Sequence, residues 1–402
     1  MAEHPEDRSA RLSLGFSCIG HSYSHLFAPI FYVVALSLEK ELTLSHGDVI
    51  TLIVAGNVLY GLAAPLAGWL GDKWSSTGMM SLFFLGTGTG MILTGTVSTP
   101  LHIGLTLALT GLFASIYHPV GMAWLVRHAA NRGMALGING IFGSIGPAVA
   151  ALSAGVLIEW FSWRAAFFVP GLLLVVTGVL FYWLVARGAI NESRVDRKVD
   201  APASRQDMVR AFVVLSVTMM CTGLIYQATQ PALPKVFSER LTDLTSGGVF
   251  GISVLVAMVY FAAGAMQITA GKMADKYPLK YVYITAFMLQ VPFLSLAGSL
   301  GGTSLLVVAM IMVSVNSGAL PAENSLVARY APSKWRGLAF GLKFILTFGV
   351  SGLGVLLEGK LYDYTGGFYW LFVVLACVAV VAAMAALLLP NERSRAATAA
   401  AE

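Results

Sequence analysis

The side chains best suited to chemistry in this sequence are ionisable groups that lie inside long apolar segments. His21 and His25 are four residues apart near the start of the chain, so they share one face of a helix. His118 lies in another apolar segment, and Glu323 and Lys343 lie in two segments of the last quarter. Ionisable groups are costly inside a membrane and usually face a protein interior or a cavity, so these five residues are candidates for binding and proton transfer.

Neutral polar side chains accompany these groups in the same or neighbouring segments. We expect them to offer hydrogen bonds to a bound solute. They are Tyr32, Asn57, Tyr60, Tyr117, Asn139, Tyr226, Gln227, Gln230, Asn316 and Asn324. A simpler alternative for such residues is a hydrogen bond to a neighbouring helix; for His118 it is contact with carbonyl groups freed by Pro119.

Glu323 and Lys343 lie at similar depths in their segments. An ion pair between them is therefore expected, and it would lower the cost of burying either charge. The alternative to a functional role is that the pair is static. Glu358 falls near the outer end of its segment and is expected to be interfacial.

The composition places these segments in a membrane. The chain has 402 residues, of which 57% are hydrophobic and 11% charged, whereas a soluble domain carries about 25% charged residues. A membrane helix needs about 20 apolar residues. Twelve such windows occur, at 13–38, 47–71, 78–97, 101–126, 133–158, 165–186, 211–234, 247–271, 281–299, 303–328, 337–357 and 367–389.

The windows predict an all-α integral membrane protein with two six-helix bundles. The first bundle is expected within residues 1–186, a polar linker at 187–210, and the second bundle with a short polar tail within 211–402. Basic residues concentrate in cytoplasmic loops, and 19 of the 25 Lys and Arg residues fall on the side that holds both termini. Both termini are therefore expected in the cytoplasm, and the net charge of +5 reflects topology and requires no nucleic-acid partner.

The two halves of the chain contain matching sequence elements. Gly68-Trp-Leu-Gly-Asp72-Lys73 follows the second window, and Gly271-Lys-Met-Ala-Asp275-Lys276 follows the eighth. Arg132-Gly-Met-Ala-Leu-Gly matches Arg336-Gly-Leu-Ala-Phe-Gly, and Asn139 and Lys343 each follow seven residues after the matched arginine. Parallel six-helix repeats are one plan for secondary transporters, with the substrate site near the midplane between the halves.

With this repeat, the sequence resembles the major facilitator superfamily over essentially its whole length. The Gly-x-x-x-Asp-Lys pattern is similar to that family's gating motif, although Trp74-Ser75-Ser76 lacks its usual basic tail. The resemblance implies a monomer whose cavity is lined by spans 1, 4, 7 and 10. It also implies gating roles for Gly68, Asp72, Lys73, Arg132, Gly271, Asp275 and Arg336. An Asp at a helix end can pair with the N-terminus of a neighbouring helix and lock two bundles together.

The first half is similar to exporters of the fosmidomycin-resistance type. The likeness rests on Ser24-His25-Leu26, Tyr117-His118-Pro119 and Phe142-Gly-Ser-Ile-Gly-Pro147. The Gly146-Pro147 pair also resembles the span-5 motif of drug antiporters. Ala28-Pro29 and Val120-Gly121 stand where that exporter pattern has acidic residues, so neither the drug nor the proton coupling carries over.

These observations favour a proton-coupled exporter of a small organic anion in the inner membrane. Three histidines and a lysine against one carboxylate would attract an anion, such as a carboxylate, phosphate or phosphonate. Because the sequence lacks a phosphate-binding Gly-x-x-x-x-Gly-Lys-Ser/Thr motif, an ion gradient must supply the energy. Glu323 is the first candidate for proton coupling, with His25 and His118 as alternatives, since histidine changes charge near neutral pH. Sodium remains open as the coupling ion.

Three other functions compete with this hypothesis. The nearest is proton-linked uptake of an organic-anion metabolite by the same fold. A membrane-embedded metal enzyme would use the three histidines, but such sites normally include carboxylates, and the two segments offer none at matching depth. A sensor would need a large soluble output domain. We therefore expect no enzyme, no metal and no cofactor, and the three separated cysteines read as core residues.

Overall fold

The computed structural model describes residues 5–129, 132–192, 205–245, 248–331, 336–350 and 352–391. Within these ranges the secondary structure is entirely helical. Among the described residues, eleven helical segments are long and apolar enough to cross a membrane, and a bent pair of helices, counted as one span, makes twelve. The prediction of an all-α protein with twelve membrane spans is confirmed.

The first half of the chain builds six spans, several of them from broken helices. In order they are α1 (Pro5–Ser24) with α2 (Phe27–Leu42); α3 (His46–Thr51), α4 (Val54–Leu62) and α5 (Ala64–Lys73); α6 (Ser76–Thr96); α7 (Pro100–Ala114), η1 (Tyr117–Gly121) and α8 (Met122–His128); α9 (Arg132–Trp160); and α10 (Trp163–Ala186).

The second half repeats this plan with longer helices. Its spans are α11 (Arg205–Arg240), which leads into the short α12 (Thr242–Thr245); α13 (Val249–Lys276); α14 (Leu279–Ala297); α15 (Gly302–Tyr330); α16 (Arg336–Phe344), η3 (Ile345–Val350) and α17 (Leu353–Thr365); and α18 (Tyr369–Leu387). α11 begins at Arg205, inside the stretch expected to be linker. Asp207 in its first turn favours a helix start there, because a negative charge complements the helix dipole.

The helix breaks have local causes. The second span bends by 41° between α4 and α5, where Pro65 occupies the first turn of α5. Proline has no N–H and clashes with the preceding turn, so it ends or kinks a helix. Pro119 lies in η1, a π-helical turn, and such turns often occur at functional sites.

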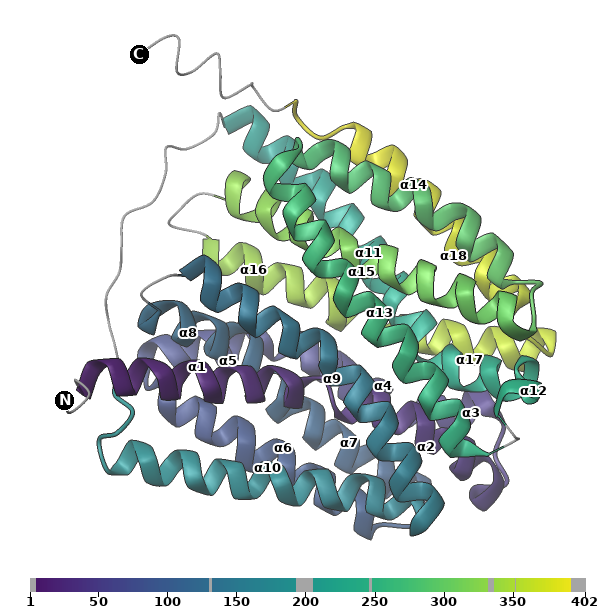
Figure 1. The fold of residues 1–402 in the computed structure, drawn as a ribbon, viewed down its shortest axis with the longest axis horizontal. Helices are drawn as coiled ribbons and strands as arrows, with labels where there is room; N and C mark the ends of the chain where they lie inside the picture. The colour runs from purple at the N-terminus through teal and green to yellow at the C-terminus, as the bar shows by residue number, and fades with distance from the viewer. Residues whose placement is uncertain are drawn as a thin grey trace.

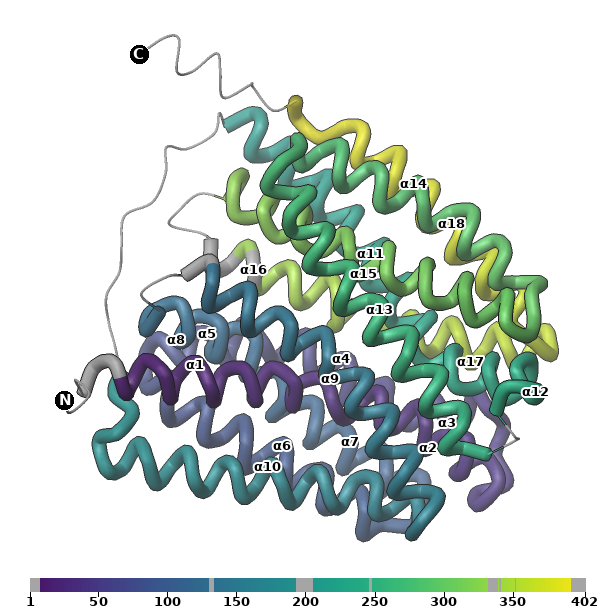
Figure 2. Tube along the Cα trace, in the orientation of Figure 1, coloured from purple at the N-terminus to yellow at the C-terminus, as the bar shows by residue number. Residues whose placement is uncertain are grey.

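The two halves form two bundles that lie side by side (Figures 1 and 2). We call the end at which α1 begins and α18 ends the near end, and the opposite end the far end. The halves meet along α9 with α13, α4 with η3, α3 with α17, and α2 with α11. Figure 1 shows α2, α3, α12 and α17 together at the far end.

Small residues allow the closest helix contacts. A Cβ atom at Gly111 of α7 would lie 2.1 Å from the carbonyl oxygen of Gly56 in α4. A Cβ atom at Gly61 of α4 would lie 2.1 Å from the backbone nitrogen of Gly349 in η3, across the two halves. Close approach of this kind is how small residues stabilise helix packing in membranes.

Replacing Gly111 with alanine should therefore destabilise the first bundle. The added methyl group has a backbone atom in its path, and overpacking of this kind costs about 1–3 kcal/mol. Gly15→Ala is the matched control, because a Cβ atom there meets nothing within 4 Å and alanine favours a helix over glycine. Thermal unfolding of the purified variants measures the difference; equal melting temperatures for both would show that the α4–α7 contact can relax.

Candidate functional site

A buried polar cluster ties α1, η1 and α9 together. The Tyr117 hydroxyl donates to the carbonyl oxygen of Ser17 at 2.6 Å and accepts from Nδ2 of Asn139 at 2.8 Å. His21 Nδ1 lies 2.8 Å from the backbone oxygen of Asn139. The structure thus brings three predicted site residues together: His21, Tyr117 and Asn139. It adds Ser17, which was not a candidate from the sequence.

The three histidines of the first half form a compact group beside this cluster. Their ring centroids are 5.3 Å apart for His21 and His25, 5.3 Å for His21 and His118, and 5.2 Å for His25 and His118. His25 lies in the break between α1 and α2, and His118 lies in the π-helical turn η1. Broken helices at mid-membrane are a common feature of transporter binding sites.

Aromatic rings connect the histidines to the second half. The ring of His118 stacks on Phe344 of α16, with centroids 5.0 Å apart. The ring of Tyr60 in α4 packs against His118, with ring centroids 5.9 Å apart, and against Phe348 of η3, with ring centroids 5.1 Å apart. The group therefore lies at the interface between the two bundles.

A buried ion pair lies in the second half. Lys343 Nζ is 2.8 Å from Oε1 of Glu323, and the side chains are 6% and 0% exposed. The contact is electrostatic, since Oε1 has no aligned hydrogen-bond donor in the described part of the chain. The Tyr283 hydroxyl donates to Oε2 at 2.6 Å, and Lys343 also donates to Asn324. The expected pair is present, and Tyr283 is a partner that the sequence did not indicate.

The charge balance expected from the sequence set three histidines and Lys343 against the single carboxylate of Glu323, which predicted a field that attracts anions. In the structure Glu323 compensates the charge of Lys343, because the two side chains are in contact and excluded from solvent. An anion would therefore have to displace Glu323 from Lys343.

Other predicted polar residues form two separate groups. Asn57 donates to the Tyr32 hydroxyl at 2.8 Å within the first half. In the second half Gln230 donates to the Tyr226 hydroxyl at 2.7 Å. Tyr226, Gln230 and Asn316 line a cavity of about 10 Å³, which is room for one water molecule. Gln227 is buried but does not line this cavity.

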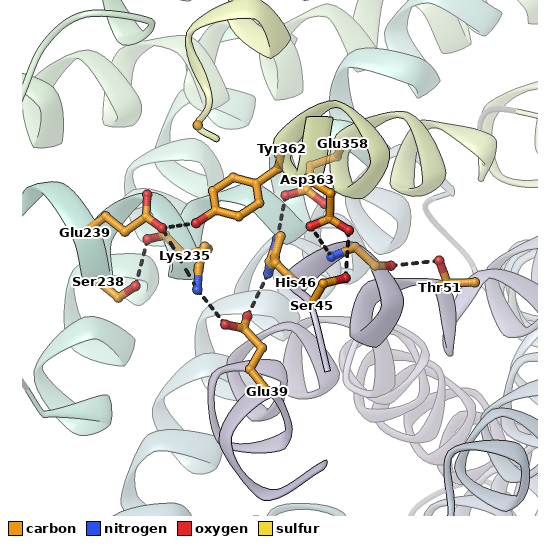
Figure 3. Close-up of polar contacts among 12 residues, drawn as sticks. Glu39, Ser45, His46, Thr51, Lys235, Ser238, Glu239, Glu358, Tyr362 and Asp363 are labelled. Atoms are coloured by element: carbon orange, nitrogen blue, oxygen red, sulfur yellow. Dashed lines mark hydrogen bonds and ion pairs between the residues drawn. The ribbon is translucent and has the colours of Figure 1, made fainter. Parts of the chain in front are cut away.

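The far end contains a polar network that joins the halves (Figure 3). His46 of α3 lies between two carboxylates, with Nδ1 2.7 Å from Glu39 and Nε2 2.8 Å from Glu358 of α17. Lys235 of α11 pairs with the second oxygen of Glu39. Asp363 accepts from Ser45 at 2.7 Å and from the backbone of Gly47 at 3.1 Å. We call these contacts the far-end latch.

Sequence reasoning missed the latch and misplaced Glu358. That residue was expected to be interfacial, but it is fully buried against His46. Because carboxylate oxygens accept hydrogen bonds, both nitrogens of His46 are donors when both partners are ionised, so the imidazole is positively charged. The partners are 312 residues apart, which is why no local pattern indicated the contact.

Among the described side chains, the residues expected to gate the near end form no comparable latch. Asp72 is 70% exposed and pairs with Arg127 of its own half at 3.4 Å. Lys73 and Asp275 are exposed, and a Cβ atom at Gly271 would meet nothing within 4 Å. A Cβ atom at Gly68 would lie 3.1 Å from the Pro119 side chain, so Gly68 permits contact between α5 and η1. The side chains of Arg132 and Arg336 lie outside the described residues.

Comparison with known proteins gives consistent similarities. The sequence-family model described as Major Facilitator Superfamily matches residues 13–260 and 215–402 of the chain. The fosmidomycin resistance protein of Escherichia coli (strain K12) is 23% identical over 367 residues, covering 88% of this chain and 86% of that protein. The probable sulfoacetate transporter SauU of Cupriavidus necator is 22% identical over 410 residues and covers 94% of each chain.

Solved structures share the fold. A bacterial homolog of the human lysosomal transporter Spinster, in its inward-facing and occupied conformation, has a TM-score of 0.74 at 12% identity and covers 96% of this chain and 97% of that chain. A mutant of the nucleoside transporter NupG has a TM-score of 0.73 at 14% identity and covers 94% of this chain and 100% of that chain.

Proposed function

Since this chain belongs to the major facilitator superfamily, we propose that it carries a small organic anion across the inner membrane, with proton coupling through Glu323 and Lys343. The family accounts for the coarser part of this statement: the protein is a multi-pass inner-membrane transporter and not an enzyme. The anion, the coupling and the direction are our proposal. The observation that carries it is the buried ion pair.

The pair suits an anion because Lys343 has a partner that a substrate can replace. A carboxylate, sulfonate or phosphonate oxygen can occupy the position of Glu323 Oε1, 2.8 Å from the ammonium group. Burying the displaced Glu323 as a charge would be costly, whereas a protonated Glu323 is neutral and can stay buried. Anion binding and protonation of Glu323 therefore favour each other.

This cooperativity determines whether the proton and the anion cross the membrane together or in exchange. When a proton and an anion bind together, they cross the membrane in the same direction, which is co-transport. The probable sulfoacetate transporter among the relatives is named for a small organic anion, in agreement with this substrate class. Co-transport is thus the function that the geometry supports best, and an inward proton gradient would drive the anion into the cell.

Export is the second candidate, and the relatives favour it. The fosmidomycin resistance protein covers most of this chain, and the puromycin resistance protein pur8 of Streptomyces alboniger is 29% identical over 147 residues, 35% of the chain. Proton-driven export requires that proton and substrate bind in turn, as the sequence led us to expect. The two candidates differ in the direction in which protons move during flux.

Alternating access gives the far-end latch its place in the cycle. With both termini in the cytoplasm, as the basic residues predict, the far end faces the periplasm. The latch then closes the periplasmic side in this state. Opening it would require separating His46 from Glu358 and Glu39 from Lys235, with near-end contacts replacing them.

Tracer flux into liposomes that contain the purified protein tests the substrate class. The compounds are radiolabelled sulfoacetate and fosmidomycin, with a nucleoside and a quaternary amine as neutral and cationic comparisons. We expect saturable flux of at least one anion and none of the comparisons. Protein-free liposomes give the leak rate. Flux restricted to neutral or cationic compounds would refute the anion assignment.

A further inference from the structure

We propose that His21, His25 and His118 form a binding site for a divalent transition-metal ion, with Zn²⁺ as the best match. The site goes beyond the proposed function, since neither the far-end latch nor the Glu323–Lys343 pair requires it. From sequence, these three histidines are the ligands that a metal enzyme would use, but no metal is expected, because no carboxylate accompanies them at matching depth.

The geometry of the three rings fits one ion. Each histidine offers one ring nitrogen, and these nitrogens all lie within 4.8 Å of one another. The three ring centroids form a nearly equilateral triangle with sides of 5.2 to 5.3 Å. With Zn–N bonds of about 2.0–2.1 Å and tetrahedral angles, ligand rings have centroids roughly 5 Å apart. Tetrahedral coordination brings the nitrogens within about 3.3 Å of one another, so the rings must turn toward a common point to complete the site.

Hydrogen bonding prepares His21 as a ligand. Its Nδ1 lies 2.8 Å from the backbone oxygen of Asn139. A carbonyl oxygen only accepts, so Nδ1 carries the proton and Nε2 keeps its lone pair. Metal-binding histidines usually show this arrangement, in which the second ring nitrogen donates to a carbonyl or carboxylate that fixes the ring.

His118 has a ring nitrogen beside the other two histidines that makes no hydrogen bond and could bind a metal ion. Its Nε2 is buried and has no hydrogen-bond partner within the described residues. Leaving a buried polar atom unsatisfied is costly, so such an atom calls for an explanation. A bound metal ion would explain this unsatisfied atom. The His118 ring stacks on Phe344, which holds the plane of the imidazole.

The donor set selects the class of metal. Imidazole nitrogens suit Zn²⁺, Cu²⁺, Ni²⁺ and Co²⁺, whereas Na⁺, Mg²⁺ and Ca²⁺ prefer oxygen ligands. Three protein ligands leave the fourth tetrahedral position open. His25 and His118 are partly buried as residues, and His21 is buried. If the proposed function holds, an oxygen of the carried anion can fill the open position, which would supply positive charge where Lys343 is already paired.

Cobalt titration of the purified full-length chain tests the site. The protein is used in detergent after removal of any polyhistidine tag, and visible absorption follows the addition of Co²⁺ in the absence of any anion substrate. We expect one ion per chain with the intense absorption of tetrahedral Co²⁺, which Zn²⁺ then displaces. His25→Ala and His118→Ala should each weaken binding at least about 10-fold.

Two further variants keep the test decisive. His102→Ala is the matched control, since His102 is exposed and bonded to Thr99 rather than to the group; it should bind like the wild type. His25→Cys replaces one ligand with another and should retain the ion while adding thiolate-to-cobalt absorption. Binding that is absent, or that is unchanged in His25→Ala, would overturn the proposal. Because no anion is present, this outcome is independent of the transport assays.

Discussion

Replacing Lys343 with methionine is expected to abolish anion flux and to destabilise the second bundle. The substitution keeps most of the side-chain volume but leaves Glu323, which is fully buried, without its counter-charge. Removing one partner of a buried pair costs about 3–5 kcal/mol. The loss in anion affinity should be of the same order, which is at least about 100-fold. Tracer flux and thermal unfolding measure the two effects.

A double substitution separates stability from function. Lys343→Met with Glu323→Gln removes both charges, and Tyr283 can still donate to the amide oxygen. This variant should recover much of the lost stability, because a neutral buried pair carries no unpaired charge, yet it should not carry the anion. Lys360→Met is the control, since Lys360 is 67% exposed and an exposed pair contributes about 0–1 kcal/mol. Anion flux in the double variant would show that Lys343 does not bind substrate.

Glu358→Gln is expected to open the far end. The substitution leaves the charged His46 with one carboxylate partner instead of two, in a buried contact between the halves. A loss of about 3 kcal/mol from this state would change the ratio of closed to open molecules by about 100-fold. The protein would then spend much of its time open at the far end.

Distances between spin labels report this change. Labels at Leu101 and Tyr364, both exposed and near the far end of opposite halves, suit the measurement, in a background without Cys18, Cys221 and Cys377. The wild type should give one short distance, and Glu358→Gln should add a longer one. Asp48→Asn breaks the exposed 3.9 Å pair with Lys360 between the same two helices, so it should leave the distribution unchanged. Identical distributions in all three proteins would contradict a latch role for His46 and Glu358.

The sequence predicted what depends on local pattern. Apolar windows gave the twelve spans because each membrane helix must satisfy its own backbone and bury its own apolar surface. The Lys343–Glu323 pair could also be foreseen, since both residues lie within one bundle at a depth that helix geometry fixes.

Features that depend on contacts between the bundles, or on irregular helix geometry within one bundle, could not be foreseen. His46 at the start of α3 and Glu358 in the middle of α17 look like ordinary helix residues until the two halves are placed together. The convergence of His118 with His21 and His25 depends on the break in the first span and on the π-helical turn in the fourth. Neither the helix break nor the π-helical turn produces a periodic sequence pattern that would predict it.

The direction of proton movement during anion flux tests the central claim most directly. Liposomes with a trapped pH dye receive an inward gradient of the anion that the tracer assay identifies, with no initial pH gradient and with the membrane potential clamped. Acidification of the interior, absent in Glu323→Gln, is the predicted result, because a proton on Glu323 enters with the anion on Lys343. Alkalinisation would mean that proton and anion exchange, which would contradict co-transport through this pair and leave export by antiport as the function.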